Sequence, residues 1–197
     1  MTAVTTIDHH QQEIDSTDMF GFWIYIMTDA ILFATLFATF IVLAHPGAPG
    51  PLLKEHIDLK YVLIETFFLL ASNFAYGLVI LSLHRNKLAA VQSWLILTFI
   101  LGACFVGMEI HEFMMLYHEG FTWQTSGTAS AFFTLVGTHG LHVSMGLLWI
   151  LVMLVQLPMM KINAITQKRM TYLGLFWNFL DIVWIFVFTI VYLMGAM

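Results

Sequence analysis

Eight ionisable side chains lie inside long apolar segments of this 197-residue chain, where each could carry chemistry or hold helices together. They are Asp29, Glu65, Glu109, His111, Glu112, His139, His142 and Asp181. A charged side chain near the centre of a bilayer costs roughly 2.5–3.5 kcal/mol on insertion scales. Protein or lipid headgroups must therefore shelter these residues, and their pattern is the main clue to function.

Four of these groups are predicted to form an inner layer. Depth follows from the helical rise of about 1.5 Å per residue, counted from each predicted helix end. His139 and His142 are three residues apart and share a helix face, as do Asn178 and Asp181. We predict a buried polar network of Asp29, His139, His142, Asp181 and Asn178, in which Asp29 pairs with His139 or His142.

The other acids are predicted to form an outer layer. Glu65, Glu109 and Glu112 fall in the outer third of their segments, and the last two share a helix face. We expect these three carboxyl groups to face a cleft filled with lipid or water.

Three interpretations of these residues remain open. They can form hydrogen bonds between helices, handle protons or contact lipid headgroups, or bind a metal or haem. The third has the weakest signal, because a di-iron bundle repeats Glu-x-x-His on separate helices. Here the pairs are Glu-x-x-Glu and one His-x-x-His.

The composition identifies the elements that must position these groups. The chain is 60% hydrophobic and 10% charged, with a mean hydropathy of +0.86. Soluble domains are about 45–50% apolar and about 25% charged, so we expect an all-α integral membrane protein. The single cysteine, Cys104, excludes an internal disulfide and a cysteine-based metal site. The few basic residues form no patch, which argues against a nucleic-acid partner.

Five apolar segments approach the roughly 20 residues that cross a bilayer. We predict a polar tail over 1–19 and a transmembrane domain over 20–197, with spans at about 20–43, 60–83, 93–116, 128–156 and 172–194. Loops are expected over 45–51, 117–127 and 158–169, and His84 to Lys87 are expected to form a polar turn within the 84–92 connection. Thr125 to Thr128 resemble a helix cap before the fourth span.

Charge predicts the orientation. Five crossings place Arg85, Lys87, Lys161, Lys168 and Arg169 on one side, and Lys54 and Lys60 on the other. The excess favours a cytoplasmic amino terminus and a periplasmic carboxyl terminus. Aromatic residues near the helix ends, Tyr192 among them, suit interfacial belts. Small residues four apart, such as Ala103 and Gly107, would permit close helix contact.

Three motifs carry a family likeness. The segment Gly137-Thr138-His139-Gly140-Leu141-His142-Val143 resembles a signature of subunit III of haem–copper terminal oxidases. Trp177-Asn178-Phe179-Leu180-Asp181-Ile182-Val183-Trp184 resembles the closing motif of that family, and Thr28-Asp29-Ala30-Ile31-Leu32-Phe33 an earlier one. The likeness runs from about Phe20 to Met197. The five-helix length and Gly107-Met108-Glu109-Ile110 look most like subunit III of bacterial cytochrome bo ubiquinol oxidases, with a cytochrome c oxidase subunit III as the alternative.

The resemblance implies a place in a complex of the bacterial inner membrane that oxidises ubiquinol, reduces oxygen to water and pumps protons. In that family the haems and copper belong to subunit I, and subunit III carries no catalytic, metal or cofactor site. It binds phospholipid and stabilises subunit I and the other subunits. The carbodiimide-reactive acid of the family maps onto Asp29, where many relatives have Glu. Asn178 stands where His is usual.

Two other classes of protein remain as alternatives. A small proton or ion transporter or channel could use Asp29, Glu65 and Asp181 as a path. Transporters often show inverted halves and interrupted helices, and this chain shows neither a repeat nor a mid-span proline. A membrane haem protein could use His139 or His142 with a histidine of another helix.

Overall fold

The computed structural model describes residues 2–44, 59–160 and 162–193, and all regular secondary structure in these regions is helical. Within them, five helical segments are long and apolar enough to cross a membrane: Thr17–Leu43, Leu59–His84, Leu88–His118, Gly127–Pro158 and Ala164–Leu193. The prediction of an all-α protein with five spans is confirmed. The predicted 45–51 loop lies outside the described residues.

The chain divides into two compact units, Met1–Thr35 and Leu36–Met197. The first unit is a stretch of helix α1, which extends over Thr2–Leu43. Its apolar part begins at Thr17, close to the predicted boundary at residue 20. Asp29 belongs to this first unit.

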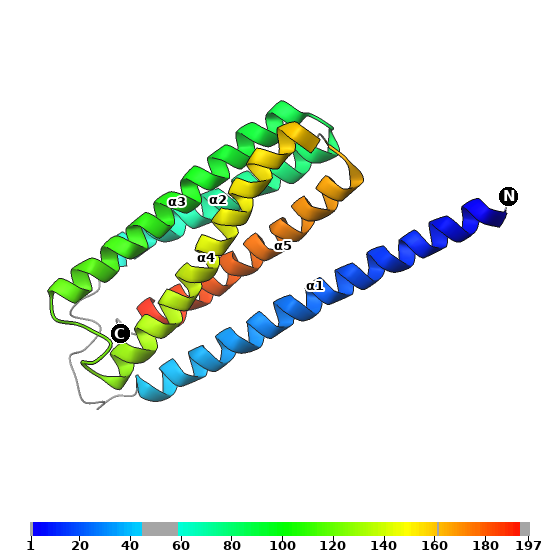
Figure 1. Cartoon of the computed structure of the whole chain (residues 1–197). Helices are drawn as coiled ribbons and strands as arrows, with labels where there is room; N and C mark the ends of the chain where they lie inside the picture. The colour runs from blue at the N-terminus through cyan, green and yellow to red at the C-terminus, as the bar shows by residue number, and fades with distance from the viewer. Residues whose placement is uncertain (1, 45–58, 161, 194–197) are drawn as a thin grey trace. The chain divides into compact units, whose positions relative to one another are not determined.

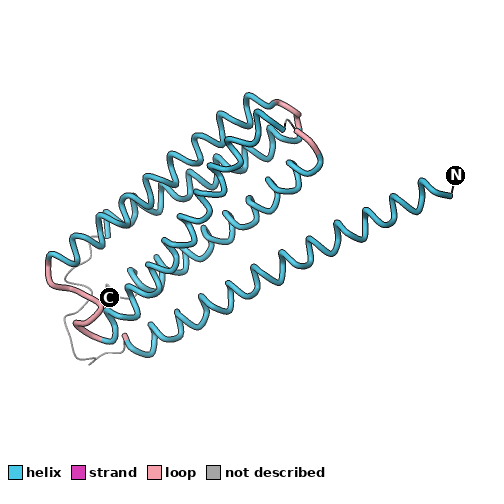
Figure 2. The backbone as a smooth tube through the Cα atoms, in the orientation of Figure 1, coloured by secondary structure: helices cyan, strands magenta, loops and turns pink. Residues whose placement is uncertain are grey.

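The second unit contains a bundle of four helices, α2 (Leu59–His84), α3 (Leu88–His118), α4 (Gly127–Met160) and α5 (Ala164–Val187). Helix α2 packs against α3 and α5, and α4 also packs against α3 and α5, so the four helices enclose one interior. They run alongside one another with short connections at the bundle ends (Figures 1 and 2). The last residues of α1 join this unit, where the Thr128 hydroxyl donates to the Leu43 carbonyl at 2.8 Å.

The turns that reverse the chain use residues suited to left-handed backbone. Asn86 (φ 52°) and Gly120 (φ 82°) follow the ends of α2 and α3. In both turns the backbone N–H groups bond back to the last carbonyls of the helix in the Schellman pattern. The predicted cap before the fourth span is confirmed, because the Ser126 hydroxyl accepts a bond from the Ala129 N–H at 3.0 Å.

The predicted loop over 158–169 is wrong. Helix α4 continues through Pro158 to Met160, and α5 begins at Ala164 rather than at 172. Proline in the last turn of a helix removes only one backbone bond, so it does not end the helix before itself. Likewise α3 begins at Leu88 instead of 93, because the segment from Leu88 to Gln92 is helical as well.

Glycines set the spacing of the bundle by accepting large side chains. A Cβ atom at Gly102 would come within 3.0 Å of the Trp177 ring, and one at Gly146 within 2.8 Å. A Cβ atom at Gly174 would come within 2.7 Å of Tyr76. The small pair predicted to mediate close helix contact does not do so within the described chain, because Ala103 is exposed and nothing lies within 4 Å of a Cβ atom at Gly107.

Candidate functional site

Two polar groups connect helices of the bundle, and the first is a bridge between α2 and α5. The amide nitrogen of Asn73 donates to Asn178 Oδ1 at 2.7 Å and to Asp181 Oδ2 at 2.8 Å. Asn178 and Asp181 share a face of α5, as predicted from their spacing, and one side chain of α2 binds both. Asp181 is buried, whereas Asn178, which we expected in a buried network, is exposed. The Asn73 amide therefore links two residues of the closing motif of α5 to α2.

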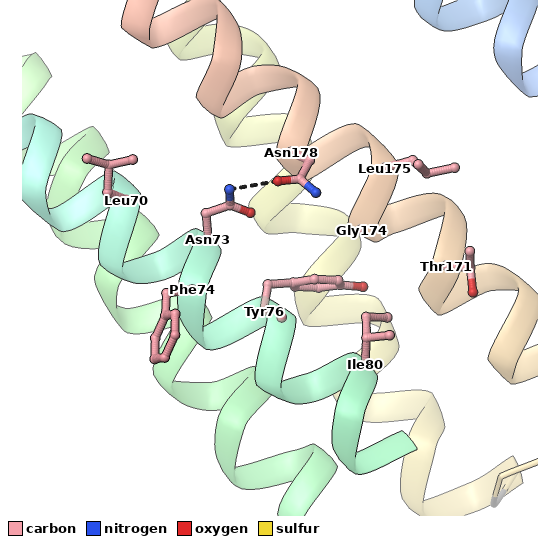
Figure 3. Close-up of a pocket in the computed structure, with 10 residues that line it drawn as sticks. Leu70, Asn73, Phe74, Tyr76, Ile80, Thr171, Gly174, Leu175 and Asn178 are labelled. Carbon is pink, nitrogen blue, oxygen red and sulfur yellow. Dashed lines mark hydrogen bonds between the residues drawn. The ribbon is translucent and has the colours of Figure 1, made fainter. Parts of the chain in front are cut away.

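A groove runs beside this bridge, between α2 and α5. Figure 3 shows Asn73 and Asn178 facing each other across it, with the Tyr76 ring lying towards Gly174. The cavity volume is about 490 Å³, and its walls are mostly apolar. The Tyr76 hydroxyl donates to the Met170 carbonyl at 2.7 Å, which satisfies it inside the bundle. The groove thus combines an apolar wall with an amide pair.

The two histidines of the predicted network have different surroundings. His139 is fully buried, with its ring centre 5.2 Å from that of Trp184 and 6.0 Å from that of Phe105. His142 is only partly buried, and its Nδ1 lies 2.7 Å from the carbonyl of Thr138 in the same helix. Their shared helix face does not give them a shared environment.

The second polar group, which we call the carboxyl cluster, comprises Glu65, Glu109, Glu112 and Tyr192. All four side chains are buried. The Tyr192 hydroxyl donates to Glu112 Oε2 at 2.9 Å, and Glu65 lies near enough to both other acids to interact with them electrostatically. The three predicted outer acids are therefore brought together.

The cluster reaches α4 through Gly140. A Cβ atom there would lie 2.5 Å from Glu109 Oε1 and 2.7 Å from Oε2, so only glycine leaves room for this carboxyl group. Gly140 directly follows His139 in the chain, so the acids meet α4 within the Gly137–Val143 motif. The helices enclose the three carboxyl groups, and the lipid- or water-filled cleft expected beside them stays a prediction.

Tyr192 is a residue whose role the sequence did not reveal. It was expected in an interfacial aromatic belt, but its side chain is fully buried. The reason is local: α5 passes into a π-helix, η2 (Phe188–Leu193), which turns this ring towards Glu112. Such π-turns inside α-helices often occur at functional positions. The wider turn spacing leaves no clear signal in the sequence.

Trp184 ties the cluster to the rest of the bundle. Its indole N–H donates to the Thr66 hydroxyl at 3.0 Å, linking α5 to α2. Its ring also meets those of Phe105 and Tyr192, with centre distances of 4.7 and 6.2 Å. The closing motif therefore contacts α2 through Asn178, Asp181 and Trp184.

Other predicted site residues lie apart from these groups. Asp29 lies in the first unit and both imidazoles in the second, so their pairing stays a prediction. His111 is exposed, with its Nδ1 3.4 Å from the Tyr61 hydroxyl. Among the described residues, no group of three or more His, Cys, Asp or Glu side chains is arranged to hold a metal ion.

The amino-acid sequence of this chain is similar to those of known proteins. A family model described as cytochrome c oxidase subunit III matches residues 1–196. The chain belongs to this family. The resemblance inferred from the motifs is thereby confirmed.

The relatives are subunits of two kinds of enzyme, quinol oxidases and cytochrome c oxidases. A cytochrome bo(3) ubiquinol oxidase subunit 3 from Pseudomonas aeruginosa is 53% identical, covering 96% of this chain and 91% of the relative. A quinol oxidase subunit 3 from Bacillus spizizenii is 45% identical, covering 94% and 91%. A cytochrome c oxidase subunit 3 from Bacillus subtilis is 42% identical, covering 89% and 85%.

Residues of the motifs that carry the family resemblance take part in both polar groups. The segment from Gly137 to Val143 supplies His139 and the glycine that accepts Glu109. The segment from Trp177 to Trp184 supplies the amide bridge and the bond to Thr66. Both motifs therefore fix contacts between helices of this subunit III chain.

Proposed function

We propose that this chain is subunit III of a ubiquinol oxidase of the cytochrome bo type, a non-catalytic subunit that stabilises the haem- and copper-bearing subunit I. The observation that carries this proposal is the 53% identity to a cytochrome bo(3) ubiquinol oxidase subunit 3 over 96% of the chain. The relative named as a cytochrome c oxidase subunit is less similar, at 42% identity, which favours quinol as the electron donor of the complex.

The arrangement of polar groups supports a stabilising role. Asn73 and Thr66 on α2 each form a hydrogen bond with a side chain of α5, so polar side chains connect these helices. Hydrogen bonds of this kind contribute about 0.6 kcal/mol each on average in a membrane protein. A helix bundle held by several such hydrogen bonds suits a subunit that stabilises neighbouring subunits.

The exposed surface supports association with lipid and with other subunits. Large apolar side chains are exposed along every helix, including Phe67, Phe74, Leu141 and Met145. In a membrane such side chains face acyl chains or the helices of a partner. The proposal therefore includes bound phospholipid and docking on subunit I.

The location and orientation belong to the same proposal. The five apolar helices and the respiratory relatives support a multi-pass protein of the bacterial inner membrane. The excess of Lys and Arg in the 84–92 and 157–171 regions supports a cytoplasmic amino terminus. The polar residues 1–19 then lie on the cytoplasmic side. A pairing of Asp29 with His139 or His142 remains part of the proposal, supported by their similar estimated depths.

The test is the composition of the native assembly. An affinity-tagged chain is purified from detergent-solubilised native membranes, and its partners are identified by mass spectrometry and absorbance. We expect haem-bearing subunits and oxygen consumption driven by ubiquinol. Oxygen consumption driven only by reduced cytochrome c would favour the cytochrome c oxidase alternative. A homo-oligomer without haem-bearing partners would favour the transporter, and a haem band in the isolated chain would favour a haem protein.

A further inference from the structure

The carboxyl cluster contains three acids that are too deeply buried for all of them to be ionised. Glu65, Glu109 and Glu112 are 0%, 3% and 7% exposed. Neither carboxyl oxygen of Glu65 or Glu109 has a hydrogen-bond partner within the part of the chain that the structure describes. Burying an ionised carboxylate without a partner costs several kcal/mol, even after relaxation. Two such groups beside each other are costlier still, because like charges repel.

Within the described residues, no lysine or arginine side chain is buried beside these three acids. Helix α2 contributes Tyr61 and Glu65, α3 contributes Glu109 and Glu112, and η2 contributes Tyr192. On α4, Gly140 faces Glu109 and His139 precedes it, packed against aromatic rings. No lysine or arginine side chain is buried among the described residues.

One acid of the three differs from the others. Glu112 accepts the hydroxyl hydrogen of Tyr192 at 2.9 Å. A phenol has a single hydrogen to donate, and a bond to an ionised acceptor is about twice as strong as one to a neutral acceptor. The donor thus favours a negative charge on Glu112, and nothing comparable favours one on Glu65 or Glu109.

We propose that the carboxyl cluster is an enclosed proton-binding site, in which Glu65 and Glu109 each hold a proton and Glu112 carries the single negative charge. The ligand of the site is the proton itself. The site does not depend on the proposed function, because its charges follow from the interior of the bundle.

Infrared spectroscopy tests this assignment directly, since protonated carboxyl groups and carboxylates absorb in separate regions. The protein is purified in its native assembly, and spectra are compared between wild type and single variants. We expect Glu65→Gln and Glu109→Gln each to remove the intensity of one protonated carboxyl. Glu112→Gln should remove a carboxylate band instead. The exposed Glu119→Gln is the matched control and should also remove only carboxylate intensity.

A second variant tests the role of the tyrosine. Tyr192→Phe removes the donor to Glu112, so we expect a gain of protonated carboxyl intensity that Glu112→Gln then abolishes in the double variant. Loss of carboxylate intensity in both Glu65→Gln and Glu109→Gln would overturn the proposal. If one glutamine variant fails to assemble, Tyr192→Phe decides the assignment through its gain of protonated carboxyl intensity. An unchanged infrared spectrum in Tyr192→Phe also overturns the proposal.

Discussion

The carboxyl group of Glu109 on α3 lies directly against the backbone of α4 at Gly140, where a Cβ atom would come within 2.5 Å of Oε1. This contact joins an acidic residue of one helix to the glycine of the His-Gly-x-His segment of the next. It explains in steric terms why that segment has glycine at this position. It also brings the carboxyl cluster to the segment of α4 that contains His139.

Gly140→Ala should displace the Glu109 carboxyl and destabilise the packing of α3 on α4. Overfilling a packed interior costs about 1–3 kcal/mol, and we expect the lower end because the displaced group is the end of a flexible side chain. The measurement is the thermal unfolding temperature of the purified assembly. Adding Glu109→Ala to Gly140→Ala relieves the clash, so the two substitutions should be less than additive. Strict additivity would show that the two residues do not meet.

Gly146→Ala should be more damaging than Gly140→Ala. Its Cβ atom would come within 2.8 Å of the rigid ring of Trp177, which cannot move aside without disturbing α5. Gly107→Ala is the matched control, because nothing lies within 4 Å of its Cβ atom. Alanine is favoured over glycine in helices by about 1 kcal/mol, so the control should be neutral or stabilising. Equal losses of thermal stability for Gly146→Ala and Gly107→Ala would contradict the contact between Gly146 and Trp177.

Asn73→Leu should weaken the contact between α2 and α5 more than Asn178→Leu does. The first substitution removes both bonds of the bridge and leaves Asp181 without its donor, whereas the second removes one bond. An unsatisfied buried polar group costs about 1–3 kcal/mol. The free energies of unfolding of the two variants in detergent give the comparison. A larger loss for Asn178→Leu would mean that Asp181 does not need Asn73.

Thr66→Val should leave the Trp184 indole without its acceptor. The valine fills nearly the same volume, so the loss of about 1–3 kcal/mol comes from the unsatisfied N–H group. Near-ultraviolet circular dichroism reports the changed tryptophan environment, and thermal unfolding reports the stability. The exposed Thr189→Val in η2 is the control, because its hydroxyl bonds only to the Ile185 carbonyl of its own helical segment. A similar response in both variants would argue against the interhelical bond.

The sequence by itself determined the class of protein, the five spans and the family. Apolar runs of membrane length leave few alternatives to helices, because every backbone group must be satisfied within the segment. The spacing of Asn178 and Asp181 also predicted that they share a helix face, and residues 125–128 predicted the Ser126 cap. These features depend on nearest neighbours along the chain, which a sequence displays directly.

Only the tertiary structure decided which partner each buried polar group meets. Helical periodicity gives the face of a residue but not the rotation of the neighbouring helix, so the sequence could not assign Asn73 to Asp181 or Glu109 to Gly140. The inward turn of Tyr192 follows from a π-helix, which breaks the spacing that periodicity assumes. Contacts between helices are set by packing in three dimensions, where a single glycine or a wider turn moves a side chain from one environment to another.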